Sequence, residues 1–109
     1  MKAKQLKELC NLKELVMGNP EGEIDGVYCC DLLSIVMGKA PQNSAWVTIM
    51  GNINSVAVAS LTEIGAIILA DGIKPDENAI KKAEKNGINI FVSDEPIFET
   101  ALKIYKALS

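Results

Sequence analysis

Apolar and polar positions along the chain divide it into short apolar runs separated by stretches of helical spacing. From Lys2 to Cys10 the apolar residues recur at helical intervals, and Asn11 follows as a left-handed stop, which predicts a short first helix. The segment from Leu12 to Met17 could prolong that helix or form a strand, and the pattern leaves both interpretations open. Glycine, proline and asparagine between residues 18 and 22 then predict a loop.

A strand, a helix and a second strand are predicted next. The segment from Ile24 to Cys30 is β-prone toward its end, Asp31 precedes an apolar run as a helix cap does, and Gly38 marks the expected end of that helix. The β-branched and aromatic residues from Ala45 to Met50 predict a buried strand. Helix and strand therefore begin to alternate in this part of the chain.

The remaining residues continue the alternation. Asn54 or Ser55 is expected to cap the next helix, and Gly65 to Ala70 is a continuous apolar run, typical of a strand covered on both faces. The last elements are a helix opened by Pro75 and Asp76 and closed by Gly87, a strand from Ile88 to Val92, and a helix capped by Ser93 and Asp94. Short connections between such elements predict right-handed βαβ units, hence an α/β fold with a mainly parallel sheet in one domain, residues 1–109.

The charged residues of the chain argue against several classes of function. Its formal net charge is −3, every one of its 11 basic residues is Lys, and it contains no His. A chain without a basic surface or Arg has little to attract nucleic acid or a membrane, and one without His lacks the usual near-neutral proton shuttle. Neither GxxxxGK nor GxGxxG is present. We therefore expect that the protein is not an enzyme and has no catalytic residues and no cofactor. We also expect that it binds neither nucleic acid nor a membrane.

The cysteines and the first residues indicate the cellular compartment. The chain has 3 cysteines, Cys10, Cys29 and Cys30, which is not an even disulfide framework, and no apolar signal segment is apparent near Met1. Reduced thiols and a cytoplasmic location are therefore expected. Three thiols without His fall short of a zinc site, so no metal is predicted. Neighbouring Cys29 and Cys30 are interpreted as packing on opposite sides of the sheet, with redox or metal chemistry as the alternative.

Polar side chains follow the predicted strands, at the sheet edge where parallel α/β folds usually bind ligands. The candidate ligand-binding residues are Asp31, Ser34, Asn52, Asn54 and Asp71. The same residue types cap helices and close turns whether or not a ligand binds, so a purely structural role is the alternative. Asp31, Asp71 and Asp94 together suggest a further interpretation, a cation site or an acid–base pair.

Four stretches resemble stand-alone DRTGG-domain proteins, and the likeness covers nearly the whole chain. These stretches run from Asp31 to Gly38, from Ala45 to Met50, from Asn52 to Leu61 and from Leu69 to Gly72. The family is similar to the N-terminal, non-kinase domain of HPr kinase/phosphorylase, and its domain also occurs between CBS modules in pyrophosphatases. The resemblance implies a three-layer α/β/α sandwich, a strand from Leu12 to Met17, and a homodimer.

The resemblance also implies a function. In that family the domain is regarded as regulatory or assembling, so we expect a non-catalytic module that senses a small molecule or nucleotide at the strand-end loops. The alternative is a docking or accessory subunit of an iron-only hydrogenase or related redox complex, because stand-alone copies are often encoded beside such subunits. The family's naming motif is expected near Ile24 to Cys30, and this stretch contains no Arg.

Overall fold

A computed structural model describes residues 1–109 and has a five-stranded sheet at its centre, in the order β1-β5-β4-β3-β2. The strands are β1 (Lys13–Val16), β2 (Gly26–Cys29), β3 (Ser44–Thr48), β4 (Ala66–Leu69) and β5 (Ile90–Val92). The helices are the 3-10 turn η1 (Ala3–Gln5), α1 (Leu6–Leu9), α2 (Leu33–Lys39), α3 (Ile53–Thr62), α4 (Glu77–Asn86) and α5 (Ile97–Leu108).

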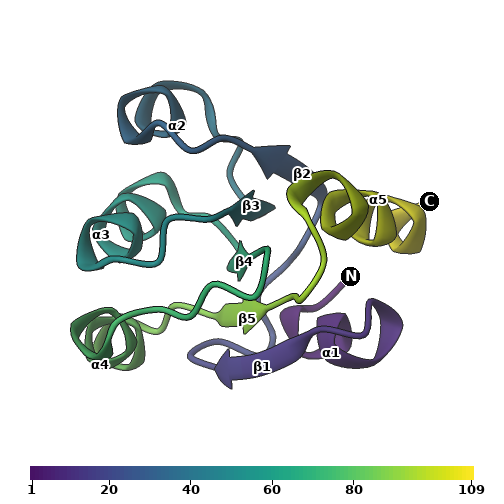
Figure 1. Cartoon of the computed structure of the whole chain (residues 1–109), viewed down its shortest axis with the longest axis horizontal. Coiled ribbons are helices and arrows are strands. Elements are labelled where there is room, and N and C mark those ends of the chain that lie inside the picture. Colours follow the sequence, from purple (N-terminus) through teal and green to yellow (C-terminus); the bar gives the residue numbers. More distant parts are fainter.

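The sheet lies between two layers of helices. Strands β2 to β5 are parallel, and β1 pairs antiparallel with β5 at one edge. Figure 1 shows α2, α3 and α4 side by side on one face, with α1 and α5 on the other. The predicted α/β fold, with its mainly parallel sheet and three layers, is confirmed, and Leu12 to Met17 contains a strand rather than a longer helix.

Each face of the sheet has its own apolar core. Trp46 belongs to the core under α2, α3 and α4, and Phe91 to the core under α1 and α5. Every residue of β3, β4 and β5 is buried, because helices cover both faces of these inner strands. Trp46 is a core residue, and its indole Nε1 donates to the carbonyl oxygen of Cys30 at 2.8 Å.

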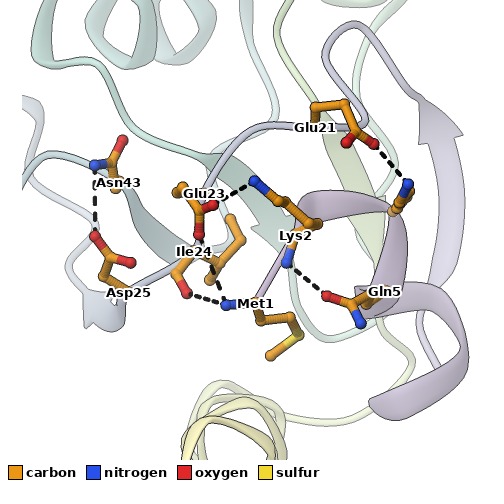
Figure 2. Close-up of polar contacts among 9 residues, drawn as sticks. Met1, Lys2, Gln5, Glu21, Glu23, Ile24, Asp25 and Asn43 are labelled. Atoms are coloured by element: carbon orange, nitrogen blue, oxygen red, sulfur yellow. Dashed lines mark hydrogen bonds and ion pairs between the residues drawn. The ribbon is translucent and has the colours of Figure 1, made fainter.

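The first turn of the chain is held to the segment before β2 by polar contacts (Figure 2). The Lys2 ammonium and the Glu23 carboxylate are 2.5 Å apart, and Lys4 and Glu21 are 2.6 Å apart. The amino group of Met1 donates to the carbonyl oxygen of Ile24 at 3.3 Å. Hydrogen bonding to Lys2, with its positive charge, lowers the pKa of Glu23, and the same contact raises the pKa of Lys2.

The beginning and end of α2 differ from the prediction. Leu32 occupies the N-cap position and no side chain caps the helix, because the Asp31 carboxylate binds the end of β3 instead. Gly38 does not end the helix, which continues to Lys39. A glycine in a left-handed conformation would stop a helix, but Gly38 does not have a positive φ.

Two further caps also differ from those predicted. Asn52, rather than Asn54 or Ser55, caps α3, and its Oδ1 accepts from the backbone N–H of Ser55 at 3.1 Å. Helix α5 begins after Pro96 without a side-chain cap. The predicted start of α4 is confirmed, and Asp76 caps the helix by accepting from the backbone N–H of Ala79 at 2.9 Å. None of the helices is long and apolar enough to cross a membrane.

Candidate ligand-binding site

A cavity of about 300 Å³ opens where β1 and β5 meet the loop between β4 and α4. Its apolar lining comes from Leu15, Pro75, Ile80 and Val92. Its polar lining comes from Asn11, Lys13, Lys74 and Asp94, with Gly72 between them. The cavity therefore combines an apolar wall with charged groups, as small-molecule sites commonly do.

Strand β1 contributes to the cavity through its register with β5. Lys13 lies opposite Val92 in the antiparallel pair, so the two side chains share one face of the sheet. Glu14 lies opposite Phe91, whose side chain belongs to the other core. A register shift after Glu14 then returns Val16 to the core beneath α4. The irregular strand thus directs both Lys13 and Leu15 to the cavity.

The loop after β4 is fixed to the loop after β5 by backbone hydrogen bonds. Asp71 and Gly72 both have left-handed backbone conformations, with φ of 57° and 67°. The N–H of Asp71 donates to the carbonyl of Glu95, and that of Gly72 to the carbonyl of Ser93, both at 2.8 Å. A methyl group at Gly72 would lie 3.7 Å from the carboxylate of Asp94. These bonds bring Gly72 and Asp94 to the same wall of the cavity.

The charged groups of the cavity have no ionic partners within the chain. The ion pairs of the chain involve the first turn, α4, and the contact between Glu95 and Lys103. Lys13, Lys74 and Asp94 take part in none of them, although all three line one cavity. Two ammonium groups and one carboxylate give this site a net positive charge, in a chain whose formal net charge is −3.

The five residues proposed from sequence lie outside this cavity. Asp31 accepts from Thr48 and from the backbone of Ile49, and Asn52 caps α3. Ser34 and Asn54 are exposed in the first turns of α2 and α3, and Asp71 is exposed beside Gly72. The structure does not bring these five residues together in one cavity, and their role in ligand binding stays a prediction.

Sequence reasoning missed most of the residues that line the cavity. The sequence places Asp94 after a predicted strand, but nothing in it distinguishes Lys13 and Lys74 from the other lysines among the 11. Lys13 reaches the site only because β1 pairs with β5 in an antiparallel manner, whereas Lys74 comes from the loop between β4 and α4. The signal that could have pointed to Lys13 is the strand implied for Leu12 to Met17 by the family resemblance.

The cysteines lie where the alternation of a strand places them. Cys29 faces α5, whereas Cys30 packs against the core under α2 and α3, which confirms the interpretation of opposite faces. Partial desolvation raises the pKa of the Cys29 thiol, and the nearby Asp31 carboxylate raises it further. Burial likewise raises the pKa of Cys10. The chain has no group of three or more Cys, His, Asp or Glu that could hold a metal ion.

A second, entirely apolar hollow lies between β2 and α5. It has a volume of about 280 Å³, and its lining residues, here called the β2–α5 groove, are Val27, Cys29, Phe98, Ala101, Leu102 and Tyr105. Phe98 is 69% exposed and Tyr105 is 64% exposed, unusually high for aromatic side chains. Strand β2 is also the edge of the sheet, so its outer backbone groups have no strand partner.

Comparisons of sequence identify no relative, whereas a comparison of structure does. The chain matches no family model and no curated protein. Its fold is similar to the CBS and DRTGG domains of the regulatory region of Clostridium perfringens pyrophosphatase, solved in complex with the activator diadenosine tetraphosphate. The TM-score is 0.71 at 12% identity, over 98% of this chain and 47% of that chain. The chain spans about half the length of this neighbour, and the likeness shows a DRTGG-like fold.

Proposed function

We propose that the chain is a non-catalytic regulatory module that senses a small molecule or nucleotide in the cavity between β1 and α4. The observation that carries this proposal is the grouping of Lys13, Lys74 and Asp94, without ionic partners, around an apolar wall. The cavity lies beyond the carboxyl ends of β4 and β5, where open parallel sheets commonly bind ligands.

The fold comparison supports a regulatory rather than a catalytic role. The neighbour consists of the CBS and DRTGG domains of a regulatory region, solved in complex with a nucleotide activator. The lining of the cavity in the present chain includes no Ser, Thr or Cys beside a base, which a nucleophilic mechanism would need. The similarity to the N-terminal domain of HPr kinase/phosphorylase, and a cytoplasmic location, stay predictions of the sequence.

Thermal shift measurements against nucleotides and small metabolites test the sensing function. A ligand that binds only the folded state raises Tm by mass action. The variant Leu15→Trp places a bulky side chain in the cavity, and it should abolish the shift. Leu61→Trp is the matched control, because Leu61 is exposed on α3 and does not line the cavity. Absence of a shift with every compound would argue against the proposal.

The same measurement tests whether the ligand binds in the cavity or at the strand-end residues predicted from the sequence. Alanine variants of these residues, Asp31, Ser34, Asn52, Asn54 and Asp71, should still show the ligand-induced shift if the cavity is the site. A shift that disappears in Asp71→Ala and Asn52→Ala, but persists in Leu15→Trp, would move the site to the loops after β3 and β4.

A second candidate function, protein docking, is favoured by the β2–α5 groove. Exposed aromatic side chains next to an unpaired edge strand are typical of surfaces that bind another protein. Two partners are predicted for this groove: a second copy of the chain, or a subunit of a hydrogenase-type redox complex. Light scattering would detect the homodimer, and Phe98→Glu should dissociate it, whereas Leu61→Glu should not. Co-purification from the native host, lost in Phe98→Glu, would identify a redox partner instead.

A further inference from the structure

Resting on the proposed sensing function, we propose that the ligand of the β1–α4 cavity is a phosphorylated small molecule with a hydroxyl-bearing body. In this arrangement Lys13 and Lys74 bind the phosphate group, and Asp94 accepts a hydrogen bond from the body of the ligand. The apolar wall contacts the rest of that body. Each part of this assignment follows from a different feature of the cavity.

The two lysines define the anionic end of the ligand. Lys13 comes from β1 and Lys74 from the loop before α4, so two distant segments of the chain each contribute a lysine to the lining of one small cavity. Two like charges that share a cavity repel each other, and an anion placed between them removes that repulsion. A phosphate group carries close to two negative charges at neutral pH and offers three acceptor oxygens, enough for both ammonium groups.

Asp94 restricts the remainder of the ligand. A carboxylate in the same cavity repels a ligand that is anionic throughout, so the part next to Asp94 must offer a hydrogen-bond donor. A sugar hydroxyl supplies that donor without adding charge. Inorganic phosphate alone would leave Asp94 without a partner and the apolar wall exposed to water. The ligand is therefore an organic phosphate rather than the free ion.

The apolar wall and the volume set the size of the body. Leu15, Ile80 and Val92 form a surface that a sugar ring or a base can cover. A volume of about 300 Å³ is at the lower end of the range for small-molecule sites. A sugar phosphate or a nucleoside monophosphate is consistent with this volume, whereas a dinucleotide would extend well outside the cavity.

Titration calorimetry on the full chain with matched pairs of compounds tests this assignment. The pairs are adenosine with adenosine 5′-monophosphate, and ribose with ribose 5-phosphate, and inorganic phosphate is measured alone. At least one phosphorylated member should bind at least tenfold more tightly than its unphosphorylated counterpart and than inorganic phosphate. Higher ionic strength should weaken that binding, because the lysines are exposed to solvent.

Two charge-removing variants and a control locate the phosphate. Lys13→Gln and Lys74→Gln should each weaken binding of the phosphorylated compound by about tenfold, as expected when one charged hydrogen bond is lost. Both residues are exposed, so neither variant should prevent folding. Lys39→Gln is the control, since Lys39 is an exposed lysine at the end of α2, away from the cavity. Asp94→Asn should weaken binding of the same compound less than either lysine variant.

The outcomes separate this assignment from the function on which it rests. If the phosphorylated members bind no better than their counterparts, or if both lysine variants bind like Lys39→Gln, the phosphate assignment is overturned. If a compound without phosphate shifts Tm and Leu15→Trp abolishes that shift, the module is still a sensor. If no compound shifts Tm and none binds in calorimetry, both the assignment and the sensing function fail.

Discussion

The carboxylate of Asp31 accepts a hydrogen bond from the hydroxyl of Thr48 at 2.7 Å, and Thr48 is completely buried. The same carboxylate oxygen accepts from the backbone N–H of Ile49 at 3.1 Å. The Thr48 hydroxyl oxygen in turn accepts from the backbone N–H of Met50 at 3.2 Å. These bonds join the end of β2 to the end of β3, which explains why Asp31 is not available to cap α2.

Replacing Asp31 by alanine should therefore destabilise the fold. The variant leaves the buried Thr48 hydroxyl without its acceptor, and we expect a loss of about 1–2 kcal/mol in the free energy of unfolding. Urea denaturation followed by the fluorescence of Trp46, the single tryptophan, measures this change. Ser34→Ala, also on the exposed surface near α2, should change it by less than about 0.5 kcal/mol. Equal stability of the two variants would contradict a structural role for Asp31.

The inner part of the fold follows from the sequence because the inner strands are buried on both faces. Such strands appear as continuous apolar runs, as from Gly65 to Ala70, and the alternating helices then require a mainly parallel sheet. Strand β1 carries no such signal, since only Val16 of its four residues is buried. The residue pattern alone is consistent with either a helix or a strand here, and only the family resemblance favours the strand.

The cavity was not predictable for a related reason. Its lining joins residues near positions 11–15, 72–80 and 92–94. Backbone hydrogen bonds between the loops after β4 and β5 bring the last two segments together, and residues 11–15 join them only through the antiparallel pairing of β1 with β5. Caps were also ambiguous where several suitable residues follow one another. Asn52, Asn54 and Ser55 can all accept an amide hydrogen bond, and only the backbone path after β3 selects Asn52.

Replacing Gly38 by alanine is expected to stabilise the fold. This glycine lies inside α2, its φ is not positive, and a methyl group added there would meet no atom within 4 Å. Gly38→Ala should therefore raise the free energy of unfolding by about 0.5–1 kcal/mol, because alanine has less conformational freedom to lose. Chemical denaturation with an unchanged m-value would register this gain. A loss of stability would mean that α2 needs glycine for some contact.

Gly18 should respond in the opposite direction to the same substitution. A methyl group on Gly18 would lie 2.4 Å from the backbone carbonyl carbon of Gly87, a distance at which the two loops cannot stay together. We expect Gly18→Ala to lower Tm by more than about 8 °C, since overpacking against backbone costs about 2 kcal/mol or more. Thermal unfolding by circular dichroism compares it with Gly38→Ala. A near-native Tm would show that the loop carrying Gly18 can move away.

The contact between Lys2 and Glu23 predicts a dependence of stability on pH. The folded-state pKa of Glu23 lies below its ordinary value of 4.5, so this carboxylate contributes stability above pH 4.5 that is lost as pH falls through the lowered pKa. The pKa of Lys2 is raised above 10.5, and its contribution is lost as pH rises through that raised value. Stability from this pair is therefore greatest between these limits.

The variant Glu23→Gln isolates that contribution. Its Tm should be slightly lower than that of the unmodified chain at pH 7, and the difference should shrink in strong acid, where Glu23 is protonated in both states. Glu84→Gln is the control, because Glu84 is exposed on α4 and belongs to no ion pair. A difference that stays constant from pH 7 down to strong acid would show that the charge of Glu23 does not stabilise the first turn.

Asn89 is expected to be the polar side chain whose loss costs most. It is 2% exposed, its Nδ2 donates to the backbone carbonyls of Asn19 and Gly65 at 2.9 and 3.0 Å, and its Oδ1 accepts from the backbone N–H of Asn19 at 2.7 Å. Asn89→Ala removes all three bonds and leaves their backbone partners partly buried. We expect it to lower the free energy of unfolding by about 2–4 kcal/mol, measured by urea denaturation.

Asn19→Ala provides the matched control for that variant. Asn19 takes part in these bonds only through its backbone, so its side chain can be removed while the network stays intact. The control should change the free energy of unfolding by less than about 0.5 kcal/mol. Comparable losses in Asn89→Ala and Asn19→Ala would mean that the Asn19 side chain holds the loop before β2 as much as the three bonds of the Asn89 side chain do. A large loss in Asn89→Ala alone would place the anchor of that loop at the start of β5.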